Sequence, residues 1–326
     1  MTFPFPSGFQ LARRLEDVPD SLKGGAVAIG NFDGVHRGHK KVLAAACETA
    51  EALDAPAVAL TFEPHPRSFF RPQAPIPRLS PAAEKRFLIA RQGLAGMVEL
   101  PFDAAMAAVT AEEFVSDILV RQMEVKAVVV GWDFHFGKNR GGSPAFLRQT
   151  APRYGIEVQV VEPVGGQNPV SSSAIRTLLR EGRIAEANRQ LGHVWFVLGE
   201  VVHGDKRGSQ LGYPTANVAL PPEAPLAHGI YAVRVQVGAA VYGGVASFGR
   251  RPQFHDAAPP LLEPYLFDFS GHLYGQTIGV EFLARLRGEE KFASVEQLVA
   301  QMDRDSAEAR RILAGPASWG AESLFG

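Results

Sequence analysis

The chain has 326 residues, of which 46% are hydrophobic and 21% charged, and its formal net charge is −1. This length exceeds the ~100–200 residues of a typical domain and predicts two globular domains. The balanced charge and the lack of a long Lys/Arg block give no indication of a nucleic-acid or membrane surface, so we expect neither as a partner. The single cysteine, Cys47, has no disulfide partner, and no run approaches the ~18 apolar residues of a spanning helix, so we expect a cytoplasmic protein.

The first half alternates apolar, strand-like runs with helical patterns. The predicted strands cover residues 25–32, 55–62, 96–102, 125–132 and 155–164. The predicted helices cover about residues 39–53, 80–94, 110–123 and 143–153, the third with Thr110 and Glu113 as a capping box. Near-continuous apolar strands separated by helices indicate a parallel, doubly wound, Rossmann-like sheet covered on both faces. Ligands of such a sheet bind beyond the C-terminal ends of its strands.

The stretch AIGNFDGVHRGHKKVL, residues 28–43, lies where the first of these strands meets its helix. The strand should end near Phe32 and the helix begin near His39, which places His36, Gly38 and His39 in the turn. The free N–H groups and positive dipole end of a helix start bind anions. Gly34 and Gly38 allow close backbone approach, and two imidazoles can donate to phosphate oxygens. The spacing therefore predicts a site for the phosphates of a nucleotide.

Other readings of this histidine pair are possible. His36 and His39 could bind a metal, but the pattern lacks a third ligand at metalloprotease spacing, and a second cysteine for a zinc site is missing. They could also be incidental residues of a surface turn. The missing ligands make metal binding the less favoured of these readings, whereas the incidental surface turn stays open on the residues alone.

Three further segments follow predicted strands and should meet at the same edge of the sheet: TFEPHP at 61–66, VVVGWDFHFGKNRGG at 128–142 and VSSSAIRTLLREG at 170–182. The string GWDFHFGKN is not a phosphate-binding P-loop, because five residues separate its glycines and Asn139 replaces the Ser or Thr. The serines of SSSAIR can cap a helix, and Arg176 adds a guanidinium suited to phosphate. A plain cap with a solvated arginine is the alternative for that segment.

From about residue 195 the pattern changes to short strands separated by Gly and Pro turns. These runs are WFVLGEVVHG, GIYAVRVQV, AVYGGVASFG, LLEPYLFDF and QTIGVEFLARLR. A final helix should start at the capping pair Ser294 and Gln297. Short strands of this kind predict a small antiparallel barrel, here closed by one C-terminal helix.

A second candidate site lies in this half. The segment GEVVHGDKRGSQLGYPTANV, residues 199–218, is rich in glycine and ends in PTAN. Thr215 and Asn217 alternate along an extended segment, so their side chains can point to one side. A hydroxyl and an amide carbonyl are hard ligands of the kind Mg²⁺ accepts. Glu263 is a carboxylate within an otherwise apolar strand, either a paired structural residue or a general base near a substrate hydroxyl.

Both halves resemble known families. The segment GNFDGVHRGH resembles the signature of the HxGH nucleotidyltransferase superfamily, in particular its FAD synthetase branch. Residues from about 195 to 312 resemble riboflavin kinase in GDKRG…LGYPTAN, GIYAV, YGGVASFG, LFDFSGHLYG and LRGEEKFASVEQL. Together the halves resemble the bacterial bifunctional riboflavin kinase and FAD synthetase over nearly the whole chain. The resemblance implies an α/β adenylyltransferase domain at 1–192 and an antiparallel β-barrel kinase domain at 193–326.

The resemblance also implies the chemistry. The kinase transfers the γ-phosphate of ATP to riboflavin, with Glu263 as base and Mg²⁺ at Thr215 and Asn217. The FMN formed then reacts with a second ATP to give FAD and pyrophosphate, with His36 and His39 as catalytic residues. The expected nucleotide- and flavin-binding residues are Gly30, Phe32, Asp33, Gly34, Gly38, Asp133, Ser172, Arg176, Gly204, Lys206, Gly208, Gly212 and Pro214. The partners expected are these small molecules, without nucleic acid or membrane.

The kinase half departs from the family pattern at several positions. Ser209 and Gln210 replace the usual basic and Thr positions, Gln253 stands where Thr is usual, and Pro264 with Tyr265 follow the expected base. A proline within a strand removes a ladder donor and predicts an edge position or a bulge at Glu263. Two other functions stay open: an adenylyltransferase for a different phosphate ester, such as nicotinamide mononucleotide or phosphopantetheine, and a flavin-binding regulator with a decayed kinase half. Retention of Thr215, Asn217 and Glu263 favours an active kinase.

Overall fold

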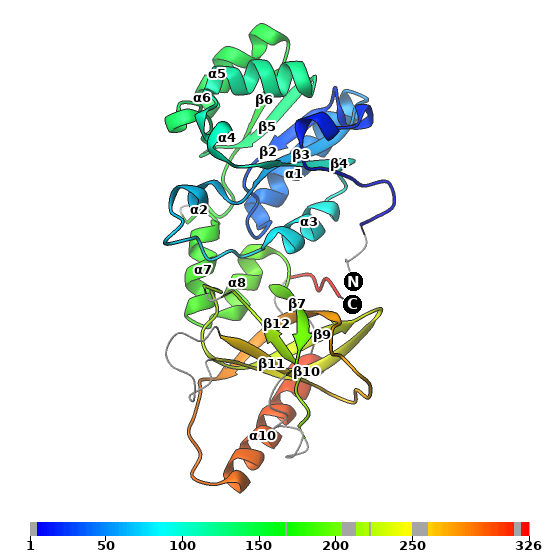
Figure 1. The fold of residues 1–326 in the computed structure, drawn as a ribbon, viewed down its shortest axis with the longest axis vertical. Coiled ribbons are helices and arrows are strands. Elements are labelled where there is room, and N and C mark those ends of the chain that lie inside the picture. The colour runs from blue at the N-terminus through cyan, green and yellow to red at the C-terminus, as the bar shows by residue number, and fades with distance from the viewer. Residues whose placement is uncertain are drawn as a thin grey trace. The chain divides into compact units, whose positions relative to one another are not determined.

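The structure is a computed structural model that describes residues 5–166, 168–203, 213–221, 223–249, 260–315 and 321–325. The chain divides into two compact units. Phe3–Ile76 and Ser80–Ser171 form the sheet unit, and Met1–Thr2, Pro77–Leu79 and Ser172–Gly326 form the barrel unit. Each unit is described by itself (Figure 1).

The sheet unit is built on six parallel strands in the order β1-β4-β3-β2-β5-β6. Their bounds are β1 Gln10–Ala12, β2 Ala26–Ile29, β3 Ala57–Glu63, β4 Gly96–Pro101, β5 Ala127–Gly131 and β6 Glu157–Val161. The five predicted strands and their parallel pairing are confirmed. The edge strand β1, which pairs with β4, was not predicted, because three residues are too short to show a periodicity.

The two faces of this sheet carry side chains of different size. Toward one face the strands present small residues such as Ala28 and Ala59, and the alanine-rich helix α1 (Arg37–Ala52) packs against β2, β3 and β5. Toward the other face they present larger residues such as Ile29, Leu60 and Val130, which join one apolar core. Both faces are therefore covered, as the near-continuous apolar strands predicted.

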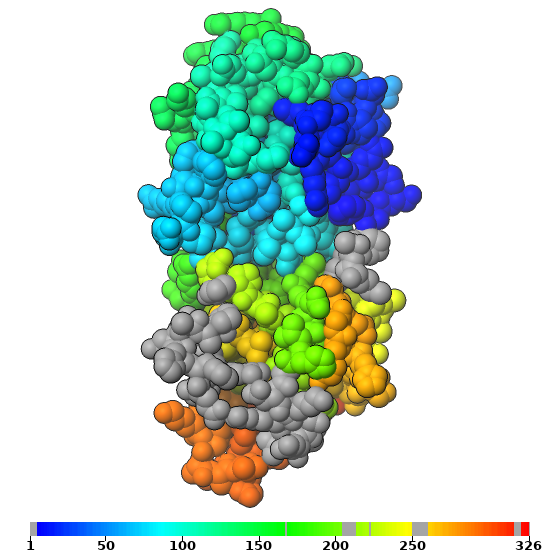
Figure 2. Space-filling view, in the orientation of Figure 1, coloured from blue at the N-terminus to red at the C-terminus, as the bar shows by residue number. Residues whose placement is uncertain are grey.

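Several shorter helices complete the sheet unit. They are α2 Pro66–Phe70, α3 Ala82–Ala90, α4 Ala104–Ala108, α5 Ala111–Glu113 and α6 Pro144–Thr150. The predicted capping box is confirmed at the start of α5, but the helix continues as a π-helix over Phe114–Gln122, which the sequence pattern did not indicate. The segment of α2 lies at the surface in the space-filling view, and Phe70 is 63% exposed (Figure 2).

The strand order fixes where a ligand of the sheet unit should bind. The chain moves from β2 through β3 to β4 on one side, then returns to place β5 and β6 on the other side of β2. The order therefore reverses between β2 and β5, and their C-terminal ends form the crevice where open α/β sheets bind ligands. Residues 30–36 leave the end of β2 and residues 132–136 leave the end of β5.

The barrel unit contains a closed, antiparallel barrel in the order β10-β11-β8-β7-β12-β9. Its bounds are β7 Phe196–Val202, β8 Asn217–Ala219, β9 Gly229–Val237, β10 Ala240–Gly249, β11 Leu261–Leu266 and β12 Thr277–Arg287. The long helix α10 (Val295–Ala314) begins at the predicted cap Ser294 and packs on β9, β10 and β12. Helices α7 (Ser172–Arg180) and α8 (Ile184–Leu191) also belong to this unit.

Pro264 lies in β11, between β10 and β8, so the predicted edge position is wrong. Its register with β10 is continuous, and its carbonyl oxygen accepts a hydrogen bond from the N–H of Ala216 at 2.9 Å. Another residue at position 264 would also donate its N–H toward that neighbouring segment, but proline has no N–H. The missing donor coincides with the break between β8 and the isolated bridge of Thr215 with Tyr265.

Candidate functional site

His36 is the N-cap of α1, since its Nδ1 accepts a hydrogen bond from the N–H of His39 at 3.3 Å. The helix begins at Arg37, two residues earlier than predicted, so Gly38 and His39 lie in its first turn. An accepting Nδ1 carries no proton, and this hydrogen bond assigns the proton of the neutral ring to Nε2. One imidazole therefore caps the helix through Nδ1 and carries its proton on Nε2, at a helix start of the kind that binds anions.

The rings of His36 and His39 are stacked, with centroids 3.7 Å apart and 16° between their planes. Burial, and then the neighbouring His36, lowers the pKa of His39 well below its ordinary value of 6.5. At neutral pH His39 is therefore an uncharged ring. Its Nδ1 is buried and has no hydrogen-bond partner among the described residues, so this atom requires one from a ligand or water.

The turn between β2 and α1 is held in an unusual backbone conformation. Phe32, Gly34 and Val35 have φ angles of 50°, 83° and 38°. Only glycine adopts positive φ without strain, so Phe32 and Val35 persist because their buried surroundings fix them. Both side chains are almost completely buried, and the Phe32 ring meets His39 edge-on at 5.4 Å.

Two predicted glycines are explained by these rings. A Cβ at Gly30 would lie 3.0 Å from the Phe32 ring, and a Cβ at Gly38 would lie 3.1 Å from Cε1 of His36. Both separations are tighter than ordinary carbon contacts. Gly30 and Gly38 thus leave room for the aromatic residues of the turn, and a direct role of either in substrate binding stays a prediction.

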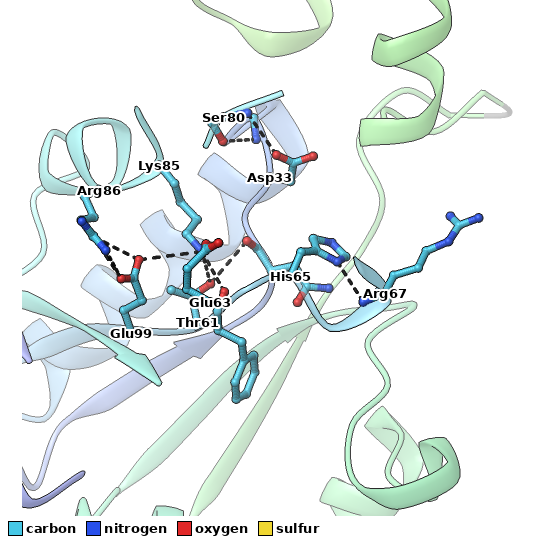
Figure 3. Close-up of polar contacts among 12 residues, drawn as sticks. Asp33, Thr61, Glu63, His65, Arg67, Ser80, Lys85, Arg86 and Glu99 are labelled. Carbon is cyan, nitrogen blue, oxygen red and sulfur yellow. Dashed lines mark hydrogen bonds and ion pairs between the residues drawn. The ribbon is translucent and has the colours of Figure 1, made fainter. Parts of the chain in front are cut away.

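Asp33 is buried and holds the turn in place. Its carboxylate accepts a hydrogen bond from the N–H of Ser80 at 3.0 Å, and the Ser80 hydroxyl accepts one from the N–H of Gly34 at 2.6 Å (Figure 3). The pair ties the turn to the residues just before α3. The sequence analysis did not identify Ser80, whose motif gave no signal beyond that of a helix start.

The other predicted phosphate-site residues differ in exposure. Asp133 is exposed and lies two residues after the end of β5, at the same reversal of strand order as His36. Ser172 starts α7 in the barrel unit. Arg176, on the same helix, is only 7% exposed, and its Nε donates to the carbonyl oxygen of Pro77 at 2.6 Å. Part of its guanidinium is thus used within the barrel unit, and its contact with phosphate stays a prediction.

The barrel unit brings the second set of candidates together through strand register. Thr215 pairs with Tyr265, in the register that also joins β8 to β11. This antiparallel register puts Asn217 opposite Glu263, and directly opposite residues share one face of a sheet. Thr215 shares that face because it is two residues from Asn217. The predicted hydroxyl, amide and carboxylate therefore occupy one face of two neighbouring segments.

Tyr213 connects this site to α10 and was missed by the sequence analysis. Its hydroxyl donates to the carboxylate of Asp303 on α10, and its ring lies 4.8 Å from that of Tyr265. Burial and the hydrogen bond to Asp303 raise the pKa of Tyr213 to about 12, so the phenol stays protonated. Pro214, one of the predicted ligands, follows directly and is exposed. The helix thus anchors the chain just before Thr215.

Several predicted positions lie outside the described residues: Gly204, Lys206, Gly208, Ser209, Gln210, Gly212 and Gln253. Within the described part of the chain, no group of three or more His, Cys, Asp and Glu side chains could hold a metal ion. Over the same residues, no helix is long and apolar enough to cross a membrane.

Comparison with known proteins gives these two sites a family. Residues 18–174 match the family model of FAD synthetase, and residues 191–313 match that of riboflavin kinase. The bifunctional riboflavin kinase/FMN adenylyltransferase of Escherichia coli strain K12 is 37% identical over 305 residues, 92% of this chain and 97% of that protein. This chain belongs to that family. The enzyme of the same description from Bacillus subtilis strain 168 is 34% identical and covers 87% of this chain and 91% of its own length.

A solved structure agrees over both units. It comes from Streptococcus pneumoniae, is titled as a macrolide-efflux protein, and is 31% identical with a TM-score of 0.82 over 93% of this chain and 99% of that one. Since both enzymatic domains of the family are present, the chain is a transferase of flavin cofactor synthesis, which converts riboflavin to FMN and FMN to FAD.

Proposed function

We propose that the turn between β2 and α1 is the adenylylation site and that the Glu263 face of β11 is the kinase site. The observation that carries the first assignment is the stacked pair His36 and His39 at the start of α1, placed where the strand order reverses. A helix start and two imidazoles suit a triphosphate, whose charge grows on the oxygens around the phosphorus under attack.

In the adenylylation step, an oxygen of the FMN phosphate attacks the α-phosphorus of ATP. A new P–O bond forms, the bond from the α-phosphorus to the oxygen bridging to the β-phosphate breaks, and pyrophosphate leaves with that oxygen. The nucleophile is already an anion, so the site needs no general base for it. Catalysis rests on alignment and charge stabilisation, in which Nε2–H of His36 and the neutral His39 donate to phosphate oxygens.

In the kinase step, the terminal ribityl hydroxyl of riboflavin attacks the γ-phosphorus of ATP, and ADP leaves. Glu263 accepts the hydroxyl proton. Asn217 lies opposite Glu263 and is only 5% exposed, so its amide is held in a defined place beside the base. This arrangement supports a working kinase more than a decayed one.

The donor set on this face fits Mg²⁺, because the Thr215 hydroxyl and the Asn217 amide carbonyl are hard oxygen ligands. When bound, the ion neutralises charge on the ATP phosphates. Thr215 and Asn217 would hold it, and Glu263 would act as the base.

The remaining assignments are proposals of the same kind. Asp133 would contact the nucleotide from the end of β5, and Ser172 and Arg176 would add donors to the phosphates. Gly204, Lys206, Gly208 and Gly212 stay proposed binding residues of the kinase substrates, as the family resemblance implies. We place the protein in the cytoplasm, where a chain with one thiol fits a reducing compartment.

The test is a time course with the full chain, riboflavin, ATP and Mg²⁺, with flavins separated by chromatography and a parallel reaction supplied with FMN. We expect FMN to appear first and FAD to follow. If riboflavin stays unchanged while supplied FMN becomes FAD, the kinase half is inactive. If neither flavin reacts, the adenylylation site acts on another phosphate ester, which a screen of phosphate monoesters with release of pyrophosphate would identify.

A further inference from the structure

Lys85, in the middle of α3, is fully buried. A buried ammonium is costly unless each of its protons has an acceptor. The structure supplies three acceptors for its Nζ, all from the last residues of β3: the carbonyl oxygen of Phe62 at 2.9 Å, Oε2 of Glu63 at 3.1 Å and the hydroxyl of Thr61 at 3.4 Å. These acceptors can take the three N–H donors of the ammonium.

This anchor reaches the histidine turn through Thr61. The Thr61 hydroxyl, which accepts from Lys85, donates to the carbonyl oxygen of Asn31 at 3.3 Å (Figure 3). Asn31 is the second residue after β2 and begins the turn that leads to His36. Thr61 has no exposed surface, so water cannot replace either bond without opening the core. Lys85 and Thr61 thus fix Asn31, near the start of that turn.

The same helix region holds the turn a second time. Ser80, two residues before α3, exchanges hydrogen bonds with Asp33 and Gly34. The turn is therefore bound at its beginning through Lys85 and at its middle through Ser80. A turn that keeps two non-glycine residues at positive φ needs such support, because strained backbone persists only where its surroundings over-determine it.

Lys85 belongs to a group of four charged side chains. Arg86 pairs through two nitrogens with Glu99 on β4, and Glu99 is also 4.0 Å from Lys85. The four side chains carry two positive and two negative charges, and only Glu63 and Arg86 have appreciable exposed side-chain surface, 28% and 19%. Among the described residues, the hydrogen bonds of Arg86 join it to Glu99 and not to the turn. This separates Lys85 from its neighbour on the same helix.

We propose that Lys85 is a positioning residue for adenylyl transfer, which holds His36 and His39 in their working arrangement through Thr61 and the end of β3. An apolar residue could fill the same volume but could not bind these backbone and hydroxyl groups together. The proposal rests on the proposed role of the histidine pair.

The decisive variant is Lys85→Met combined with Glu63→Gln, which removes one positive and one negative charge. The control is Arg86→Met combined with Glu99→Gln, which removes the same charges from the same quartet without touching the turn. We expect the first pair to lower kcat for FAD formation from FMN by about tenfold or more, with a smaller change in KM, because misplacement of catalytic groups acts on the chemical step. The control pair should stay within about twofold of the parent in kcat.

Two measurements separate positioning from mere stability. Lys85→Met alone should melt at a lower temperature than the double variant, because it leaves Glu63 without its cation; kcat should stay low in both. FMN formation by the barrel unit of the same chains reports an intact kinase and should not change. Recovery of kcat together with the melting temperature would overturn the proposal.

Thr61→Val keeps the proposal testable if the Lys85 variants fail to fold. It removes the hydroxyl between Lys85 and Asn31 and preserves the shape of the side chain, and we expect kcat for FAD formation to fall about threefold to tenfold. Parental kcat in folded Thr61→Val would overturn the inference while leaving the proposed function intact. Full FAD formation by His36→Ala would instead overturn the proposed function.

Discussion

The sheet unit holds its histidines at the start of a helix, whereas the barrel unit holds Glu263 and Asn217 on two neighbouring strands. In the sheet unit one ring has two assignments, because Nδ1 of His36 caps α1 and the same ring is proposed to contact phosphate. In the barrel unit the backbone ladder fixes the segments, and the carboxylate takes no part in the ladder. A substitution of His36 should therefore affect both the helix start and catalysis, whereas a substitution of Glu263 should affect catalysis without disturbing the strands.

The largest expected effect is the loss of one activity in each of two variants, with the other activity kept. Glu263→Gln should lower FMN formation by a factor on the order of 10²–10⁴, as removal of a general base does, and leave FAD formation from supplied FMN unchanged. His36→Ala should do the reverse, with a loss on the order of 10²–10³. Chromatographic assays of both steps on each variant test this. Loss of both activities in either folded variant would contradict the separation of the sites.

A second variant of His36 separates its role as helix cap from its proposed role in FAD formation. His36→Ala also removes the helix cap, which costs about 0.5–2 kcal/mol, whereas the amide of His36→Asn can still accept from the N–H of His39. We therefore expect the asparagine variant to unfold close to the parent and still fail to make FAD. Thermal unfolding of the two variants side by side checks the difference.

Gly38→Ala should have an intermediate effect. Alanine in the first turn of α1 favours the helix by about 0.5–1 kcal/mol, but its Cβ would lie 3.1 Å from Cε1 and 3.2 Å from Nδ1 of His36. The imidazole has to move by a few tenths of an ångström, and this shift acts on the ring that donates to phosphate. We expect FAD formation to fall about tenfold without loss of stability, and FMN formation to stay constant. Parental FAD formation would show that the ring tolerates the shift.

The sequence was sufficient for the parts that depend on short-range pattern. The apolar runs predicted the parallel strands, GNFDGVHRGH predicted the histidine turn, and the alternation of Thr215 and Asn217 predicted their common face. The edge position at Pro264 was wrong, because closure of a barrel depends on strands far away in the chain.

Contacts across long sequence separations could not be read from the sequence. Ser80 and Lys85 meet the histidine turn and β3 only after α3 has folded back on the sheet. A lysine in a helical pattern is ordinarily a solvated residue, so its complete burial had no signal. The same holds for Tyr213, which meets Asp303 ninety residues later.

A fall in pH should have the smallest effect, and it should change the free energy of unfolding in opposite directions in the two units. In the sheet unit the pKa of His39 is lowered well below 6.5. As the pH falls, His39 is therefore protonated in the unfolded chain before it is protonated in the folded one. Below about pH 6.5 the free energy of unfolding of this unit should therefore fall, by at most about 1.4 kcal/mol per pH unit for one proton.

In the barrel unit the sign is opposite. Glu281 has no exposed surface, and burial raises its pKa above 4.5, although its carboxylate accepts hydrogen bonds from the hydroxyl of Ser323 and the N–H of Leu324. Arg234 only partly opposes that shift. As the pH falls through the folded pKa toward 4.5, the folded state binds a proton before the unfolded state does, and this contribution raises the free energy of unfolding.

Hydrogen exchange measured by mass spectrometry at several pH values, corrected for intrinsic exchange rates, would follow peptides of β12 and residues 321–325 separately from those of α1. Protection of the β12 peptides should depend less on pH in Glu281→Gln than in the parent, because the substitution removes the titrating group from this contact. The α1 peptides should keep their loss of protection below pH 6.5 in both proteins. An identical pH response of the β12 peptides in the two proteins would contradict this role of Glu281 and leave the pH response of His39 as a separate result.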